Sequence, residues 1–306
     1  MLRPRSFEKG ARAAARQAVR VIDVHTHLHP PRLFAAIRRW FAERSQWDIS
    51  AQPTEPADVA AVLRANGVER FVFCSYAHKT GMAAELNAWL TDTARQLGGA
   101  GIPLGTVHLD DPDPLGDLNA ALDAGCAGIK IHEDVQRLAV DDPRFEPIFA
   151  EIERRNGIVL AHIGPIPWAY DTRAGAERVA STLERHPGLQ FVVAHMGAPD
   201  TSQYFAAMER LPNLYLDTTM VFAPGSPLQG SAQLADLEQH ANRVLYGTDY
   251  PNVPYAYDSE RSGLQALGLS APALAAILGE NARRLLGPYA SADRESPGAA
   301  RTSPSP

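Results

Sequence analysis

Eight short runs rich in β-branched and aromatic residues alternate with longer amphipathic stretches along most of this 306-residue chain. Runs of this kind, bounded by Gly, Pro, Asn or Asp, are typical of buried β-strands. We expect strands at residues 20–26, 69–75, 102–108, 127–132, 157–163, 190–195, 213–218 and 243–248. Their regular alternation restricts the fold more than any other feature of the sequence.

The stretches between the runs have the apolar periodicity of helices. Several end at a glycine, as at Gly67, Gly157 and Gly188, and the next strand follows directly. Eight strands that alternate with helices favour a parallel sheet closed as a TIM-type (β/α)8 barrel over a Rossmann-like sheet, and no GxGxxG follows the first strand. We expect helices at residues 57–66, 82–97, 115–124, 145–155, 174–186, 200–210, 231–240 and 271–286.

One barrel domain accounts for residues 20–287, since such barrels commonly take about 250 residues. Residues 1–19 are predominantly basic, and we interpret them as a flexible extension. An organellar transit peptide is the alternative interpretation, but hydroxyl residues are scarce there. Residues 288–306 are rich in Ser, Pro and Ala with almost no large apolar residues, which predicts a disordered tail.

Composition indicates the kind of partner. The formal net charge of −6 gives no basic footprint for nucleic acid, and no apolar run approaches the roughly 20 residues that span a bilayer. We therefore expect a soluble protein with a small-molecule substrate. The two cysteines, Cys74 and Cys126, indicate neither a disulfide framework nor a cysteine metal site, which suits the cytoplasm. Aromatic residues in the segment 31–50 offer a surface for homo-oligomerisation.

Polar side chains end most of the apolar runs. In a (β/α)8 barrel the carboxyl ends of the strands meet at one face, which carries the active site. Two histidines with one residue between them end the first run and lie on the same face of an extended strand. The strand-end residues that we expect to converge are His25, His27, Lys130, His132, His162, His195 and Asp249.

Imidazole nitrogens with a carboxylate oxygen suit Zn²⁺ or a similar divalent ion. Such an ion lowers the pKa of a bound water toward about 7 and makes it a nucleophile at neutral pH. Asp249 is the candidate to accept the proton of that water and to pass it to the leaving group. The residues therefore predict metal-assisted catalysis.

Five segments together resemble the amidohydrolase superfamily, and most closely the amidohydrolase-related family that includes aminocarboxymuconate semialdehyde decarboxylase. The resemblance covers about residues 20–286 in order. Its segments are IDVHTHLHP (22–30), GIKIH (128–132), LAHIG (160–164), VAHMG (193–197) and LYGTDYP (245–251).

The resemblance implies that His25, His27, His162 and Asp249 bind one divalent metal ion, most simply zinc, and that His195 stabilises the attacking water and the developing charge. Lys130 would face the substrate and suit a carboxylate or an oxyanion. In binuclear relatives a lysine at this strand is carboxylated and bridges two metals. Lys130 in that role, with His195 on a second ion, is the alternative.

The leading interpretation is a metal-dependent hydrolase that acts on the carbonyl of an amide, ester or lactone. The alternative enzyme is a metal-dependent, non-oxidative decarboxylase of a carboxylated aromatic or unsaturated acid, since the same ligands serve both reactions. A related pyrone-dicarboxylate lactonase branch works without a metal. A barrel that only binds a ligand is the third hypothesis, and the convergent strand ends argue against it.

Several residues outside these strand ends are weaker candidates. Tyr76 and His78 follow the second run and either line the pocket or lie in a solvated loop. The segment 31–50 either covers the mouth of the barrel or packs against its outer ring. His186 and His240, at helix ends, are expected at the surface.

Overall fold

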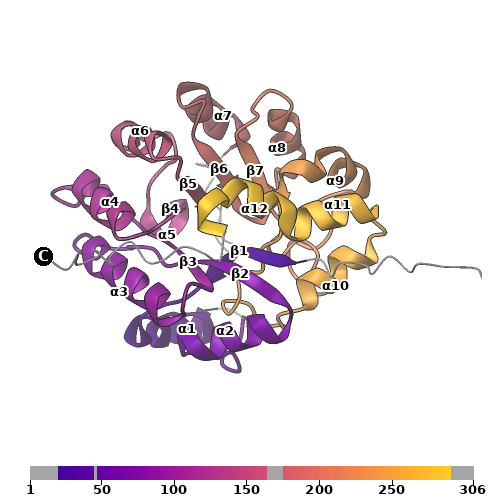
Figure 1. Ribbon diagram of the computed structural model, residues 1–306, viewed down its shortest axis with the longest axis horizontal. Coiled ribbons are helices and arrows are strands. Elements are labelled where there is room, and N and C mark those ends of the chain that lie inside the picture. Colours follow the sequence, from indigo (N-terminus) through magenta and orange to yellow (C-terminus); the bar gives the residue numbers. More distant parts are fainter. Residues whose placement is uncertain (1–19, 45–46, 164–174, 291–306) are drawn as a thin grey trace, which may run out of the picture.

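The computed structural model describes residues 20–44, 47–163 and 175–290, and these form a parallel (β/α)8 barrel, as the sequence predicts (Figure 1). The third and eighth strands are shorter than expected, because the chain leaves the sheet there and enters loops at the carboxyl end. The strands are β1 (Val21–His27), β2 (Val68–Cys74), β3 (Gly101–Leu104), β4 (Gly128–His132), β5 (Ile158–His162), β6 (Gln190–Val193), β7 (Leu214–Asp217) and β8 (Val244–Leu245).

Helices follow the strands and form the outer ring (Figure 1). Pro56 and Pro114 occupy the first turns of two of them, where the fixed φ of proline favours helix initiation. A π-helical segment, Ala276–Glu280, interrupts the helix expected at 271–286. The helices are α1 (Pro31–Arg44), α2 (Pro56–Ala65), α3 (Ala83–Gln96), α4 (Pro114–Asp123), α5 (Glu133–Gln136), α6 (Glu146–Arg154), α7 (Ala176–Arg185), α8 (Thr201–Met208), α9 (Leu234–His240), α10 (Ser259–Ala266), α11 (Ala271–Ala275) and α12 (Asn281–Leu286).

The barrel closes through two short junctions between a three-stranded sheet, β1-β2-β3, and a five-stranded sheet, β4-β5-β6-β7-β8. At one junction the amide of Lys130 donates to the carbonyl of Gly105 at 2.8 Å. At the other, the amide of Asp249 donates to the carbonyl of His25 at 2.8 Å. This second junction brings the end of β1 beside the chain that follows β8.

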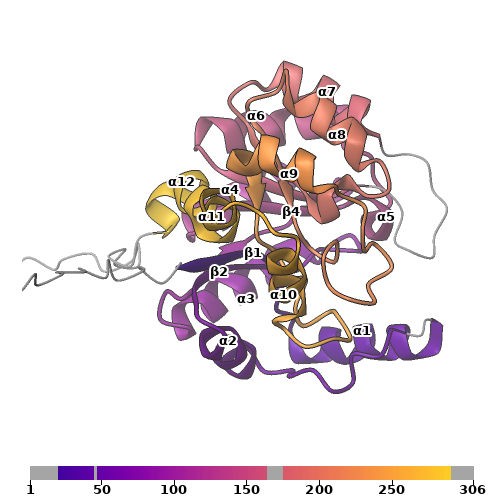
Figure 2. The ribbon, with the colours of Figure 1, turned by 90° about the vertical axis from the view of Figure 1, so that its right-hand side faces the viewer.

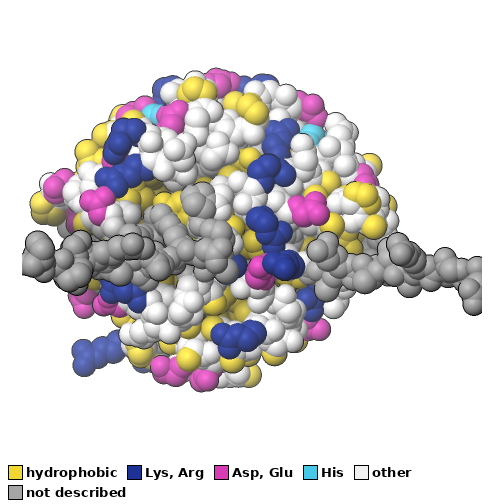
Figure 3. All heavy atoms as spheres, viewed as in Figure 1, with side chains coloured by type: hydrophobic (Ala, Val, Ile, Leu, Met, Phe, Trp, Pro, Cys, Tyr) yellow, Lys and Arg dark blue, Asp and Glu magenta, His cyan; other side chains and the backbone are white. Residues whose placement is uncertain are grey.

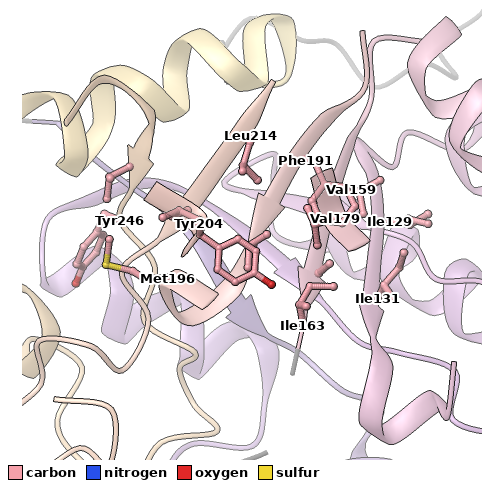
Figure 4. Close-up of a cluster of buried hydrophobic side chains, with 14 of the residues drawn as sticks. Ile129, Ile131, Val159, Ile163, Val179, Phe191, Met196, Tyr204, Leu214 and Tyr246 are labelled. Atoms are coloured by element: carbon pink, nitrogen blue, oxygen red, sulfur yellow. The ribbon is translucent and has the colours of Figure 1, made fainter. Parts of the chain in front are cut away.

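Two apolar clusters hold the barrel together. The inner cluster fills the space enclosed by the strands and includes Ile22, Leu104 and Leu160. The outer cluster joins the strands to the helices, and Figure 4 shows part of it, with Phe191 of β6 and Tyr204 of α8. Successive residues of a strand point to opposite faces, so β1, β2 and β5 to β8 each supply both clusters, whereas β3 supplies the inner cluster and β4 the outer one.

The two ends of the barrel differ. Ala282 and Leu286 of α12 pack on the inner cluster and close the amino end of the strands. In Figure 1 this helix crosses in front of the strands, and Figure 2 shows α1 and α5 at the end away from it. The carboxyl ends of the strands therefore open on the side of α1.

A β-bulge in β1 aims the two histidines of that strand. Asp23 pairs with Phe71 and Thr26 with Phe73, so three steps on β1 match two steps on β2. A bulge of this kind inserts one residue and redirects the side chains that follow. Asp23 contacts the outer layer through Tyr257, whereas His25, two residues later, faces the site.

Basic and acidic side chains both occur on the face shown in Figure 3. Among the described residues, no helix is long and apolar enough to cross a membrane. The expected basic extension, at 1–19, and nearly all of the expected tail, at 291–306, lie outside the described residues.

Candidate active site

The carboxyl ends of the strands open into a cavity of about 320 Å³. All nine residues that the sequence singles out for the site line this cavity. They are His25, His27, Tyr76, His78, Lys130, His132, His162, His195 and Asp249.

Three atoms that could bind a metal ion converge at the strand ends, which form the floor of the cavity: Oδ1 of Asp249 and the Nε2 atoms of His25 and His27. Oδ1 of Asp249 lies 2.8 Å from Nε2 of His27 and 3.3 Å from Nε2 of His25. Donors about 2.0–2.1 Å from a tetrahedral ion are about 3.3 Å apart, so these separations fit a divalent metal ion with little adjustment. Two imidazoles and a carboxylate also suit the chemistry of Zn²⁺ or Mn²⁺.

Asp217, at the end of β7, fixes the orientation of His25. Its Oδ2 lies 2.8 Å from Nδ1 of His25, so the ring donates its proton to the carboxylate and leaves the Nε2 lone pair for a metal. Its Oδ1 accepts from the amides of His195 and Thr219 at 2.8 and 3.1 Å. Sequence reasoning placed Asp217 at a strand end but gave it no role, although the same strand-end rule applies to it.

Lys130 is buried on the floor beside His25. Its Nζ lies 2.8 Å from Nε2 of His25, and donates to the lone pair that Asp217 leaves exposed. A metal ion on that nitrogen competes with the ammonium group. Lys130 is therefore close enough to interact either with the ligand set or with a substrate beside it.

His162 and His195 form a second pair of imidazoles. Nδ1 of His195 lies 3.2 Å from the carbonyl of Thr219 and donates to it, so Nε2 is the acceptor. That nitrogen lies 3.0 Å from Nδ1 of His162, which therefore carries a proton. The tautomer leaves the Nε2 lone pair of His162 available to a metal. His195 has a φ of 56°, a strained conformation for a residue with a side chain.

His132 contributes a hydrogen-bond donor. Its ring stacks on His162 with the centroids 4.0 Å apart. Its Nδ1 accepts from the amide of Val135 at 3.4 Å, at the start of α5, which leaves the proton on Nε2. The ring centroid of Tyr76 is 5.1 Å from that of His132. An oxygen-rich group of a ligand can therefore be bound on this side of the cavity.

Burial sets the protonation states of the site. Burial, and then Lys130, lowers the pKa of His25 to about 4 and that of His132 well below its usual value. Burial raises the pKa of Asp249, but the rings of His27 and His25 lower it by more than burial raises it. The pKa of Asp249 therefore lies below its usual value. Burial likewise raises the pKa of Asp217, and His25 brings it down to about 2. The floor therefore combines the ionised carboxylates of Asp249 and Asp217 with the neutral imidazole rings of His25 and His132.

Two further residues near the donors escaped the sequence analysis. Oδ2 of Asp23 accepts from Oγ1 of Thr248 at 2.7 Å and from the hydroxyl of Tyr257 at 2.9 Å, which ties β1 to the chain before Asp249. Sγ of Cys74 lies with ring nitrogens of His25 and His27, all within 4.8 Å of one another. Cys74 lies within an apolar run of the sequence, and nothing in that run predicts that its sulfur lies beside the histidines.

The segment 31–50 contributes a wall of the cavity, through Leu33, Ala36, Ile37, Trp40, Phe41 and Trp47. The interpretation that it covers the mouth of the barrel is therefore favoured over packing on the outer ring. Nε1 of Trp47 donates to the carbonyl of Asn252 at 2.7 Å and so attaches this wall to the loop after β8.

The expected surface positions of His186 and His240 are wrong, because both rings are buried between helices. Nε2 of His186 lies 3.0 Å from Oε2 of Glu146, and the ring of His240 stacks on Phe205 with centroids 5.1 Å apart. Helix ends that pack against neighbouring helices bury their last side chains, which sequence position alone does not reveal.

The fold and the site together define a class of enzyme, the metal-dependent barrel hydrolases and their decarboxylase relatives. A family model described as amidohydrolase matches residues 22–287. The chain belongs to the amidohydrolase family. No curated protein matches the sequence significantly.

Solved structures with the same fold include an uncharacterised TIM-barrel protein from Bordetella bronchiseptica, with 24% identity and a TM-score of 0.68 over 87% of this chain and 98% of that chain. A 5-carboxyvanillate decarboxylase from Novosphingobium aromaticivorans, complexed with manganese and 4-hydroxy-3-methoxy-5-nitrobenzoic acid, has 17% identity and a TM-score of 0.62 over 89% and 97%. A probable 2-pyrone-4,6-dicarboxylic acid hydrolase from Acinetobacter baumannii, with citric acid bound, has 13% identity and a TM-score of 0.63 over 87% and 99%.

Proposed function

We propose that this protein is a metal-dependent hydrolase that cleaves an amide, ester or lactone bond of a small organic substrate. One observation carries the proposal: two imidazole nitrogens and a carboxylate oxygen converge beneath a cavity, with a lysine beside them. A divalent ion bound there lowers the pKa of a water and polarises a carbonyl.

His25, His27, His162 and Asp249 would hold one such ion. The tautomers support this set, because the carboxylate of Asp217 and the ring of His195 each accept a proton from a neighbouring imidazole and leave its Nε2 lone pair free. We propose zinc as the ion, with manganese as the alternative, since the donor set suits both. A carboxylated Lys130 that bridges two ions is the second arrangement, and the measured metal content separates the two.

The remaining residues act on the water and the carbonyl. Asp249 is ionised and accepts the proton of the attacking water, then returns it to the leaving group. Nε2 of His195 accepts from Nδ1 of His162 in this structure, so His195 would orient the water and gain a proton only after the water replaces His162 as its hydrogen-bond donor. Lys130, with the Nε2 proton of His132, stabilises the negative charge that forms on the carbonyl oxygen.

Decarboxylation of a carboxylated aromatic or unsaturated acid is the second candidate. Lys130 and His132 offer a cation and a donor to a carboxylate on the same side of the floor. A neighbour with the same fold is a decarboxylase. In that reaction the carbon that loses carbon dioxide has to gain a proton. Asp249 is ionised and Nε2 of His195 carries no proton, so this pair would first take up a proton from solvent and then deliver it to the carbon.

Metal content and a substrate panel test the proposal together. The purified protein is analysed for divalent metals, treated with a chelator and reloaded with Zn²⁺ or Mn²⁺. Esters and lactones are assayed by proton release, amides by release of the amine, and carboxylated aromatics by carbon dioxide evolution. We expect stoichiometric metal, loss of activity on chelation, and proton release without carbon dioxide. Carbon dioxide without hydrolysis would support the decarboxylase, and activity that survives complete removal of metal would refute both.

A further inference from the structure

The cavity has two unlike parts. Among the described residues that line it, the only Lys, Arg, Asp and Glu side chains are those of Lys130 and Asp249, and both lie on the floor with the imidazoles. The facing wall comes from α1 and the residue Trp47 after it. It presents only hydrocarbon and aromatic side chains: Leu33, Ala36, Ile37, Trp40, Phe41 and Trp47.

The apolar wall is an ordered face of one helix. Its members recur at spacings of three and four residues, which places them on one side of α1. Arg32 and Arg39 are exposed elsewhere on the same helix. Leu33, Ile37 and Trp40 are half-buried, so each has surface to offer a ligand in the cavity.

The wall is held at a fixed position relative to the floor. Phe34 is buried and its ring centroid lies 5.5 Å from that of His29, which follows β1. Beyond α1, Nε2 of Gln52 donates to the carbonyls of Val253 and Tyr255 at 2.8 and 3.0 Å, and Trp47 bonds to Asn252. Because the wall is already ordered, binding of an apolar group to it does not include the entropy cost of ordering these side chains.

We infer that the substrate has a single polar reacting group and a bulky apolar body of at least two fused rings or equivalent size, and that α1 selects this body. The inference rests on the proposed function, because it assigns the polar group to the floor. The cavity of about 320 Å³ has room for more than one ring. A second charged group would lie against α1 and lose its hydration, and the described residues that form this wall offer it no partner of opposite charge.

Three carboxylates test the inference, because a carboxylate is the product of hydrolysis and the substrate of decarboxylation. Benzoate, 2-naphthoate and benzene-1,3-dicarboxylate are titrated into the metal-loaded protein, and their dissociation constants are measured by calorimetry. We expect 2-naphthoate to bind about tenfold tighter than benzoate, from roughly 55 Å² of added apolar surface at about 25 cal/mol per Å². We expect the dicarboxylate to bind at least about tenfold more weakly than benzoate.

Variants of α1 test whether the apolar wall causes the tighter binding of 2-naphthoate. Ile37→Ala and Trp40→Ala should reduce the advantage of 2-naphthoate to about threefold or less and leave benzoate binding nearly unchanged. Arg39→Ala, an exposed position on the same helix, is the matched control and should retain the tenfold advantage. Melting temperatures of all variants confirm that they are folded.

The outcomes separate the two proposals. If benzoate binds but 2-naphthoate binds no tighter, or if its advantage survives both α1 variants, the inference is wrong and the proposed function is unaffected. If the protein binds neither metal nor any of the three carboxylates, the proposed function is wrong, and the inference that rests on it is wrong as well.

Discussion

Two separate parts of the barrel deliver site residues in different ways. Strands β4 and β5 pair without interruption, from Gly128 with Ile158 to His132 with His162, and simple alternation points Lys130, His132 and His162 inward. The junction of β1 with the chain after β8 is irregular. β1 has a β-bulge between Asp23 and Thr26 where it pairs with β2, and Asp249, in the chain after β8, has a φ of 62°.

The difference shows what holds each set of donors in place. On β4 and β5 the ladder of backbone hydrogen bonds suffices. At the β1–β8 junction, side-chain hydrogen bonds hold the donors in place. Asp217 fixes the ring of His25, and Asp23 binds Thr248 beside Asp249. The conformation of Asp249 costs on the order of 1–3 kcal/mol and persists only because the surroundings impose it. We therefore expect substitutions of the supporting residues at the junction to affect metal binding, and substitutions at the outward-facing positions of the β4–β5 ladder to affect only stability.

The largest effect is expected from Asp249→Asn. The amide retains the shape of the carboxylate but cannot accept a proton, so turnover should fall by about 10²–10⁴-fold, measured at saturating metal. Wild-type activity in this variant would show that Asp249 is not the proton acceptor. Because Asp249 also belongs to the ligand set, the metal content of the assayed variant has to be measured in parallel.

Asp217→Asn tests the carboxylate that orients His25. The backbone amides of His195 and Thr219 keep an acceptor oxygen, but the ring of His25 loses its anionic partner. We expect the affinity for Zn²⁺ to fall by about 10–100-fold, measured by competition with a chelator. An unchanged affinity would contradict the role of Asp217 at the junction.

Gly247→Ala tests how closely the chain after β8 approaches β1. A Cβ at this position would lie 2.7 Å from Oγ1 of Thr219 and 2.9 Å from Cβ of His25. Overpacking of this kind costs about 1–3 kcal/mol, and it should displace His25. We expect a lower melting temperature and weaker metal binding together. Gly98→Ala is an open position with positive φ, and should affect the melting temperature without changing metal affinity.

The smallest effect is expected from Ile129→Val in the regular ladder. Ile129 is buried in the outer cluster on β4, one residue before Lys130, and the substitution removes one methyl group. Unfolding should become easier by about 0.5–1.5 kcal/mol in a denaturant titration. Metal affinity should stay within about twofold of the wild type. A larger change in metal affinity would show that the ladder also tunes the site.

The regular parts of the molecule were predictable from the sequence. Alternation identified all eight strands and placed Lys130, His132 and His162 on the inner face, because the period of a strand is two. The placement of His25 and His27 on one face was also predicted, since one residue separates them. The sequence did not predict the bulge itself, because an extra residue in a strand leaves no compositional mark.

The supporting groups were harder to predict. Asp217 and Asp23 act through contacts with residues about 190 and 225 positions away in sequence, and no local pattern encodes such contacts. Cys74 reads as one more apolar residue of β2, and only the fold places it beside His27. The segment around Trp40 was recognised as aromatic, but its place over the cavity depends on its bond to the loop after β8.

The apolar wall on α1 lies outside the strands, in a connection between β1 and α2, whereas the donors that carry out chemistry lie on the barrel itself. Recognition and reaction are therefore encoded in separate stretches of the gene. On the proposed assignment, we expect a change confined to codons 31–47 to exchange one substrate for another while the proposed metal ligands stay the same. Laboratory evolution of new substrate preferences in this protein has a natural starting library in those positions.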